Sequence, residues 1–265
     1  MIKAVAVDMD GTFLNSQNDY DRPRFEQVFA QMQEKGIRFI VASGNQYYQL
    51  KSFFPEKENQ ITFVSENGAL TFNKQQLVKE QHFTPALVKK IIAFLVAESN
   101  DLEFIACGIE SSYVLKSASE RFKQFARIYN YELEELASFA ALPADPIVKF
   151  ALDVAVEKNN QIADHLNETF AGEITAVTSG HGSIDIILPG VTKGRAIAEL
   201  LAEWGIEPNE LVAFGDANND REMLALTEHS YAMQESSPEV LATAKKQAPS
   251  HNDSGVLQVL EKILQ

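Results

Sequence analysis

The sequence is poor in cysteine and histidine. Its 265 residues include one cysteine, Cys107, and five histidines. A single cysteine cannot form a disulfide within the chain. Because Cys107 lies in the apolar segment 102–108 with no obvious base beside it, we expect a buried, unreactive thiol. The histidines are scattered and do not show the spacing of a zinc site.

Long apolar segments are also missing. No uninterrupted hydrophobic run approaches the ~20 residues that a membrane-spanning helix needs. The N-terminal sequence MIKAVAVDMDGT introduces carboxylates at Asp8 and Asp10 before the apolar part of a signal peptide could form. We therefore expect a soluble, cytoplasmic protein with no membrane partner.

Basic residues are the minority among the charged residues. There are 23 Lys and Arg against 37 Asp and Glu, which gives a formal net charge of −14 at pH 7. Nucleic-acid affinity comes largely from basic side chains that neutralise phosphates, so we expect no nucleic-acid partner. A small anionic substrate is compatible with this charge, because a local cation, a lysine and backbone N–H groups dominate at short range.

The chain has ample material for a folded core, since 45% of its residues are hydrophobic and 23% are charged. Apolar, β-branched runs that predict buried strands alternate with segments of helical spacing near the N-terminus. Such alternation predicts a parallel sheet with right-handed crossovers. We expect strands at 2–7, 37–42 and 61–64, and helices between Asp21 and Gly36 and over 47–54.

The pattern changes in the middle of the chain. There, strands outnumber helices and often come in adjacent pairs, which predicts an α+β unit with an antiparallel sheet. The Glu-rich run Glu132–Glu135 is interpreted as a solvated helix face. After Pro189-Gly190 the alternation returns, with a helix over 192–204 and a strand at 211–214. The predicted fold class is α/β: a Rossmann-like parallel-sheet core domain from residues 1–80 and 189–265, and an inserted α+β domain from 81–188.

Polar residues follow each predicted core strand. Ligands of open α/β sheets bind at the carboxyl ends of the parallel strands, so these residues should meet at one edge of the sheet. They are Asp8-Met9-Asp10-Gly11-Thr12, Ser43-Gly44-Asn45, Glu66-Asn67-Gly68 and Gly215-Asp216, the last followed by Asn218-Asn219-Asp220.

Two carboxylates two residues apart, Asp8 and Asp10, can lie on the same side of the chain, where they repel each other unless a cation or a proton intervenes. With Asp216 as a third carboxylate, the set suits Mg²⁺, which prefers octahedral oxygen coordination. One carboxylate can attack phosphorus and form an aspartyl-phosphate. The other can protonate the leaving oxygen and later deprotonate water.

Other groups in these motifs suit a phosphoryl group. Gly11 and Thr12 place backbone N–H groups in a tight turn, where they can cradle phosphate oxygens. Ser43 offers a hydroxyl and Lys193 a positive charge. Asn67 and Gly68 are compatible with a plain turn and with lining of a phosphate site, and both interpretations remain open.

Taken in order, these motifs resemble those of the haloacid dehalogenase (HAD) superfamily. The insertion between the second and third motifs looks like the large α/β cap of the Cof type, class IIB. The segments Glu66–Ala69 and Ile184–Gly194 are also similar to Cof-type members. The segment Ser179–Asp185 looks most like the sugar-phosphate phosphatases of this group. The four motifs are Asp8–Thr12, Ser43-Gly44, Lys193 and Gly215–Asp220.

The resemblance implies a role for each motif residue. Asp8 would be the nucleophile and Asp10 the general acid and base, while Ser43 and Lys193 would bind the phosphoryl group. Mg²⁺ would be held by Asp8, the Asp10 carbonyl and Asp216, and Asn219 and Asp220 would support phosphate, metal or Lys193. The predicted metal set is thus Asp8, Asp10, Asp216, Asn219 and Asp220. The predicted substrate-binding set is Gly11, Thr12, Ser43, Gly44, Asn67, His181, Lys193 and Asn219.

His181 and Asn45 differ from the other residues of these motifs. His181 lies between two glycines of a predicted loop and is interpreted either as a surface residue or as a substrate contact. Asn45 stands where many relatives have an arginine, so any role of that arginine is missing here. Cap residues vary among relatives, so the substrate does not carry over from the resemblance.

The sequence therefore predicts a Mg²⁺-dependent phosphoric monoester hydrolase that acts on small phosphate esters, above all sugar phosphates, through Asp8. Two alternatives stay open. One is a phosphosugar mutase or phosphotransferase of the same superfamily, which returns the phosphoryl group to a sugar. The other is a phospho-accepting receiver domain of signalling proteins, although the long insertion has no counterpart there. We expect a monomer or a homodimer.

Overall fold

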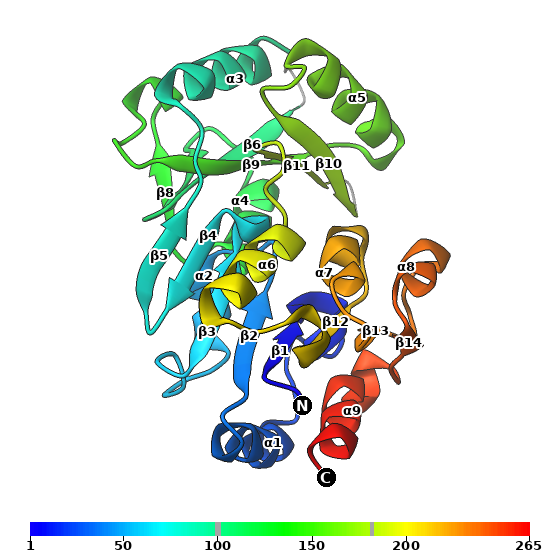
Figure 1. Cartoon of the computed structure of the whole chain (residues 1–265). Helices are drawn as coiled ribbons and strands as arrows, with labels where there is room; N and C mark the ends of the chain where they lie inside the picture. The colour runs from blue at the N-terminus through cyan, green and yellow to red at the C-terminus, as the bar shows by residue number, and fades with distance from the viewer. Residues whose placement is uncertain (99–101, 181–182) are drawn as a thin grey trace. The chain divides into compact units, whose positions relative to one another are not determined.

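The computed structural model describes residues 1–98, 102–180 and 183–265 and shows two compact units (Figure 1). The first unit comprises Met1–Lys79 and Thr192–Gln265, and the second comprises Glu80–Val191. The sequence pattern predicts these boundaries after residues 80 and 188. That the second unit acts as a cap stays a prediction.

Over its described residues, the first unit is built on an eight-stranded sheet with the order β14-β13-β12-β1-β2-β3-β4-β5. The strands from β14 to β3 run parallel, and β4 is antiparallel to β3. The strands are β1 (Ala4–Val7), β2 (Arg38–Ala42), β3 (Ile61–Ser65), β4 (Leu70–Asn73), β5 (Gln76–Glu80), β12 (Leu211–Gly215), β13 (Ser230–Ala232) and β14 (Lys246–Gln247). The helices are α1 (Arg22–Glu34), α2 (Tyr47–Ser52), α6 (Lys193–Trp204), α7 (Arg221–Ala225), α8 (Pro238–Thr243) and α9 (Gly255–Leu264).

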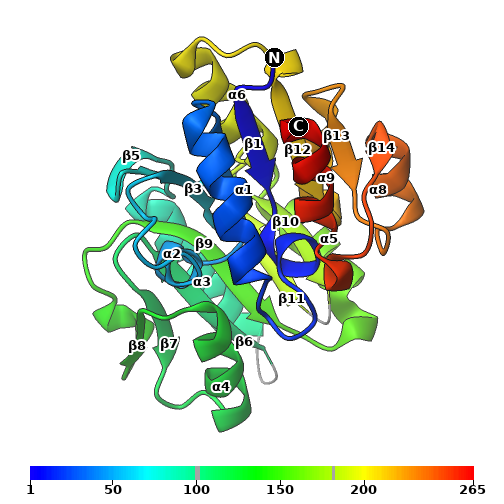
Figure 2. The ribbon, with the colours of Figure 1, turned by 90° about the horizontal axis from the view of Figure 1, so that it is seen from below.

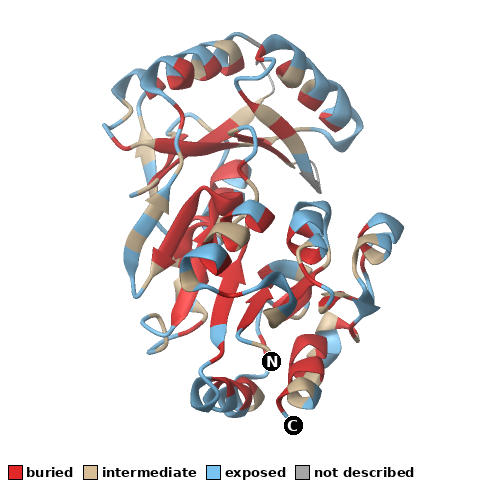
Figure 3. Cartoon of the chain, viewed as in Figure 1, coloured by how far each residue is buried: buried red, intermediate tan, exposed pale blue. Residues whose placement is uncertain are grey.

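Helices cover both faces of this sheet, which is why its central strands are buried along most of their length (Figure 3). On one face Ala4 and Ala6 of β1 share a core cluster with Ile197 and Leu200 of α6. On the other face α1 and α9 lie side by side (Figure 2). This sandwich fixes the strands whose carboxyl ends carry the predicted site.

Local signals in the sequence account for the ends of the flanking helices. The Asp21 side chain accepts a hydrogen bond from the Arg24 backbone at the start of α1, where Pro23 occupies the first turn. Thr192 caps α6 in the same way by accepting from the Arg195 backbone. Gly205 ends α6 with φ 64°, a conformation that favours glycine.

The second unit contains a separate sheet, which has six strands among the described residues in the order β10-β11-β9-β6-β7-β8. The pairs are antiparallel except β7 with β8. Its strands are β6 (Glu103–Gly108), β7 (Ser112–Leu115), β8 (Leu133–Leu136), β9 (Ile147–Asp153), β10 (Thr175–Gly180) and β11 (Ser183–Ile187). Its helices are α3 (Pro85–Glu98), α4 (Glu120–Tyr129) and α5 (Asn159–Thr169).

One local prediction in this unit is wrong. The run Glu132–Glu135, interpreted from the sequence as a solvated helix face, lies mostly in strand β8. Leu133 and Leu136 are three residues apart, which is also a helical spacing, so the local pattern misleads. The strand forms because β8 pairs in parallel with β7. The negative charge of Glu135 is compensated there by ion pairs with Lys123 and Arg127.

The predicted fold class is confirmed. The first and last parts of the chain form a mainly parallel α/β sheet, and the part between them forms a mainly antiparallel α+β sheet. Cys107 is buried in β6, as expected. Among the residues that the structure describes, no helix is both long and apolar enough to cross a membrane.

The aromatic cluster between α1 and the sheet offers a test of the first unit's core. The Phe25 ring is fully buried, and its centroid lies 5.5 Å from that of Phe39 in β2 and 5.4 Å from that of Phe13. We predict that Phe25→Ala lowers the free energy of unfolding of this unit by about 3–5 kcal/mol. Val78→Ala in the half-exposed edge strand β5 should cost less than about 1 kcal/mol. Denaturant unfolding of both variants measures this, and equal losses would contradict the packing described here.

Candidate active site

Asp8 is placed by the end of strand β1. Its backbone N–H donates to the Phe214 carbonyl of β12 (3.1 Å), after which the chain turns tightly over Met9–Phe13. The turn needs Gly11, which has φ 74°. A side chain there would also meet Asp216, because a Cβ would lie 2.6 Å from its Oδ2. The turn therefore brings the residues after β1 against those after β12.

Lys193 approaches this turn from the first residue of α6. Its side chain is buried, and its Nζ lies 2.6 Å from Asp8 Oδ1 and 2.8 Å from Asp220 Oδ1. Burial alone would lower the pKa of Lys193, but the two carboxylates outweigh it and raise this pKa above its ordinary value. Lys193 therefore stays protonated between two acidic residues.

Asp220 uses both carboxylate oxygens inside the protein. Oδ1 accepts from Lys193, and Oδ2 accepts from the backbone N–H groups of Asp216 (3.0 Å) and Ala217 (3.1 Å). Asp220 thus links the buried lysine to the loop that follows β12.

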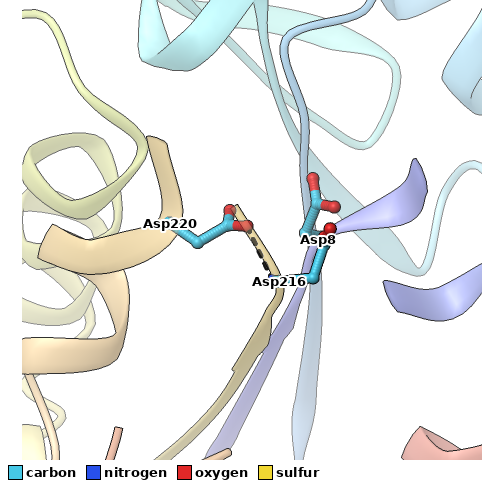
Figure 4. A group of neighbouring side chains, drawn as sticks. All are labelled: Asp8, Asp216 and Asp220. Atoms are coloured by element: carbon cyan, nitrogen blue, oxygen red, sulfur yellow. Dashed lines mark hydrogen bonds between the residues drawn. The ribbon is translucent and has the colours of Figure 1, made fainter. Parts of the chain in front are cut away.

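Three carboxylates converge at this point (Figure 4). Asp8, Asp216 and Asp220 each offer an oxygen within 4.8 Å of the others, a grouping able to hold a metal ion. Thr12 Oγ1 donates to Asp216 Oδ1 (2.8 Å) and orients that side chain. Burial and the neighbouring Asp220 raise the pKa of Asp216 to about 6. The same two causes raise the pKa of Asp8 well above its usual range, even though Lys193 opposes them.

Burial is the largest cause of these pKa shifts, and repulsion from the neighbouring carboxylates adds to it despite the charge of Lys193. A divalent cation beside Asp8 and Asp216 would relieve the repulsion that raises their pKa values. Carboxylate oxygens are also the ligands that Mg²⁺ prefers. The residues present therefore fit a magnesium ion.

Asp10 and Ser43 both form hydrogen bonds with Asn45, next to the three clustered carboxylates. Asp10 reaches the surface, and its Oδ2 accepts a hydrogen bond from Asn45 Nδ2 (2.6 Å). Desolvation raises the pKa of Asp10, while the bond from Asn45 lowers it. Ser43 is buried, and its Oγ accepts from the Asn45 backbone N–H (3.1 Å).

The loop after β3 closes the other side of these contacts. Glu66, Asn67 and Gly68 all have positive φ, and Gly68, at 103°, approaches the Thr192 backbone so closely that a Cβ would lie 2.4 Å from the carbonyl oxygen. The Asn67 backbone N–H donates to the Ser43 carbonyl (3.0 Å), and its side chain accepts from Asn219 Nδ2 (3.1 Å). The loop thereby connects Ser43 with the start of α6.

The structure brings most of the predicted site residues together. Of the five predicted metal ligands, Asp8, Asp216 and Asp220 cluster, whereas the Asp10 carboxylate pairs with Asn45 and the Asn219 amide with Asn67. The glycines border the same groups, with Gly11 against Asp216 and Gly44 against Asn67. His181 lies outside the described residues.

Sequence reasoning missed one contact of this site. It treated Asn45 only as a missing arginine, yet its side chain contacts Asp10 directly. The one available signal was its place two residues after Ser43, at the end of a core strand.

Known proteins with similar sequences and structures support a common assignment. The sequence profile of a haloacid dehalogenase-like hydrolase family matches residues 5–260. The chain is 42% identical over 263 residues to 5-amino-6-(5-phospho-D-ribitylamino)uracil phosphatase YbjI of Escherichia coli K12, covering 99% of this chain and 96% of that protein.

Two solved structures share the fold over the whole length. SMU.1108c from Streptococcus mutans superposes with a TM-score of 0.94 at 38% identity and covers 100% of this chain and 99% of that one. The HAD subclass IIB sugar phosphatase BT4131 superposes with a TM-score of 0.81 at 19% identity, with 98% of both chains covered, which shows the shared fold alone.

These likenesses confirm the superfamily expected from the four motifs and support the predicted enzyme class, a phosphoric monoester hydrolase. The family match spans both parts of the first unit and the second unit between them. This chain belongs to the haloacid dehalogenase-like hydrolase family.

Proposed function

We propose that this protein is a Mg²⁺-dependent phosphatase that hydrolyses small phosphate monoesters through an aspartyl-phosphate on Asp8. One observation carries the proposal. Asp8 lies at the end of a core strand, beside Asp216 and 2.6 Å from a buried, protonated lysine. This places a carboxylate nucleophile where positive charge can bind the phosphoryl group that it attacks.

In the first half of the reaction, an Asp8 carboxylate oxygen attacks phosphorus and the bond from phosphorus to the ester oxygen breaks. The Asp10 carboxyl group gives its proton to that leaving oxygen, so that the alcohol departs neutral. Lys193 and the backbone N–H groups of the turn at Gly11 and Thr12 stabilise the charge on the phosphoryl oxygens.

In the second half, the Asp10 carboxylate takes a proton from a water molecule as the water oxygen attacks phosphorus. The bond between phosphorus and Asp8 breaks, which releases inorganic phosphate and restores the Asp8 carboxylate. Asp10 is protonated again and ready for the next ester. Each half breaks one phosphorus–oxygen bond and forms one, and the net reaction is hydrolysis.

Asp8 and Asp216 are the residues that would hold the magnesium ion. Both oxygens of Asp220 already accept hydrogen bonds, so we assign Asp220 to holding Lys193 and the loop after β12. The bound ion supplies charge neutralisation, which lets an anionic nucleophile approach an anionic phosphate. The Thr12 hydroxyl keeps Asp216 directed toward the site.

The substrate class that we propose is a phosphorylated sugar or sugar alcohol. YbjI, which is 42% identical, is named for a substrate with a phosphorylated ribityl chain. That compound is therefore the first ester to test.

Phosphate release from a panel of small esters tests the substrate class. We predict Mg²⁺-dependent release that is fastest with phosphorylated sugars or sugar alcohols, among them the ribitylaminouracil phosphate. Conversion of one sugar phosphate into an isomer that requires a sugar bisphosphate activator, without net release of phosphate, would favour a mutase instead. A stable phosphoprotein without turnover would favour a receiver domain, and either result would contradict the proposal.

Replacement of the nucleophile gives a second test. We predict that Asp8→Asn lowers kcat on the order of 10⁴-fold or more, the scale observed when a nucleophile is removed. The melting temperature without metal should not fall, because the change removes one charge from a repelling cluster while Asp220 still pairs with Lys193. Asp19→Asn is the matched control, since that exposed aspartate pairs only with Arg22 at 2.9 Å among the ion pairs of the described residues. An active Asp8→Asn enzyme would exclude the mechanism.

The raised pKa of Asp216 predicts how magnesium stabilises the protein. An acid whose pKa is raised to about 6 on folding contributes stability below its ordinary value of 3.8, and that stability is lost as pH rises through about 6. Mg²⁺ compensates the ionised form, so it should raise the melting temperature more at about pH 7.5 than at about pH 5. Chelation by EDTA should abolish turnover, and added Mg²⁺ should restore it. Thermal unfolding with Mg²⁺ and with EDTA measures the shift; equal shifts at both pH values, or full activity in EDTA, would refute the assignment.

A further inference from the structure

The Asp10 side chain is held by Asn45, a residue for which the resemblance to the superfamily motifs implies no role. Asn45 Nδ2 donates a 2.6 Å hydrogen bond to Asp10 Oδ2. The two residues are 35 positions apart and follow different strands, Asp10 after β1 and Asn45 after β2. Their contact therefore depends on the parallel pairing of those strands, not on local sequence.

The backbone of Asn45 is itself fixed at both ends of the residue. Its N–H donates to Ser43 Oγ (3.1 Å), and its carbonyl accepts from the Glu66 N–H (3.2 Å). Ser43 in turn is bound to the strand and loop beside it, since its N–H donates to the Val64 carbonyl (2.9 Å) and its carbonyl accepts from Asn67 (3.0 Å). A side chain that starts from such a constrained position can hold a partner in one orientation.

The amide of Asn45 also suits the two protonation states that Asp10 must adopt. An amide donates through Nδ2 to a carboxylate and accepts through Oδ1 from a protonated carboxyl group. An arginine at this position could only donate, and its permanent charge would favour the carboxylate alone. A neutral partner therefore fits a residue that is an acid in one half of the reaction and a base in the other.

We propose that Asn45 is a positioning residue for Asp10: it holds the carboxyl group where it delivers a proton to the leaving oxygen of the ester. This inference rests on the proposed phosphatase function. Asn45 acts through Asp10 and does not bind the phosphoryl group, which Lys193 and the turn after β1 hold.

The inference makes a specific prediction about leaving groups. A sugar or other alkyl oxygen leaves as a strong base and needs the proton from Asp10. A p-nitrophenolate leaves as a stable anion and does not need it. The ratio kcat/KM covers steps only as far as formation of the aspartyl-phosphate, so it isolates this proton transfer from the later attack of water.

The experiment compares Asn45→Ala and Asn45→Leu with the wild type on an alkyl phosphate and on p-nitrophenyl phosphate. We expect kcat/KM for the alkyl ester to fall about 10- to 100-fold, the cost of a misplaced catalytic group. For p-nitrophenyl phosphate it should fall less than about threefold. Inhibition by inorganic phosphate should change by less than about threefold, because phosphate binding does not involve Asn45. Asn45→Leu keeps similar volume without hydrogen-bonding capacity and serves if the alanine variant folds poorly.

Two controls make the result decisive. Asn59→Ala removes an exposed amide that pairs with Gln75 elsewhere in the same unit, and it should leave both esters unaffected. Adding Asn45→Ala to Asp10→Ala should cause no further loss, because the two residues act as one unit. Equal losses on both esters, additive losses in the double variant, or weakened phosphate inhibition would overturn the positioning role. A wild type that releases phosphate from neither ester would instead refute the proposed function itself.

Discussion

The folded state of the first unit depends on how the positive charge of one buried lysine is compensated. Lys193 is 1% exposed, and a buried charge without partners would cost several kcal/mol. Its ion pairs with Asp8 and Asp220 remove that penalty. Because Lys193 begins α6, Asp8 follows β1 and Asp220 follows β12, the same contacts tie three distant segments together. The folded arrangement and the proposed phosphoryl-binding charge are thus one structural feature.

The acidic cluster around this lysine lowers the stability of the fold, and the same carboxylates are those that would bind the cation and attack phosphorus. Burial, and after it repulsion between the carboxylates, raises the pKa values of Asp8 and Asp216, so the ionised cluster opposes folding in the absence of a cation. A magnesium ion would relieve that repulsion and leave Asp8 ionised for attack. Asp10 lies outside the cluster and pairs with a neutral amide, which suits a group that must gain and lose a proton. Differences in local environment therefore support different roles for two aspartates that are two residues apart.

Much of the fold was predictable because its signals are local. Runs such as Ile37–Ala42 are mainly apolar, with Arg38 as their one charged residue, and are followed by polar residues, so they indicate both the strand and the edge where ligands bind. Strand β8 was not predictable, since its Leu-Glu-Glu-Leu sequence fits a helix equally well and only pairing with β7 decides. The contact between Asn45 and Asp10 was missed for a related reason. It depends on how two loops from neighbouring strands face each other, which the spacing of residues along the chain does not predict.

Trapping the phosphoryl group on the enzyme tests the proposed mechanism most directly. The protein would be mixed with excess ester and Mg²⁺, quenched in acid within the first turnover, and digested for mass spectrometry. We predict a phosphoryl group on Asp8 that hydroxylamine removes, as it does from an acyl phosphate, and that is absent from Asp8→Asn. Inorganic phosphate that accumulates while Asp8 is never phosphorylated would contradict the mechanism and would point to direct attack by water.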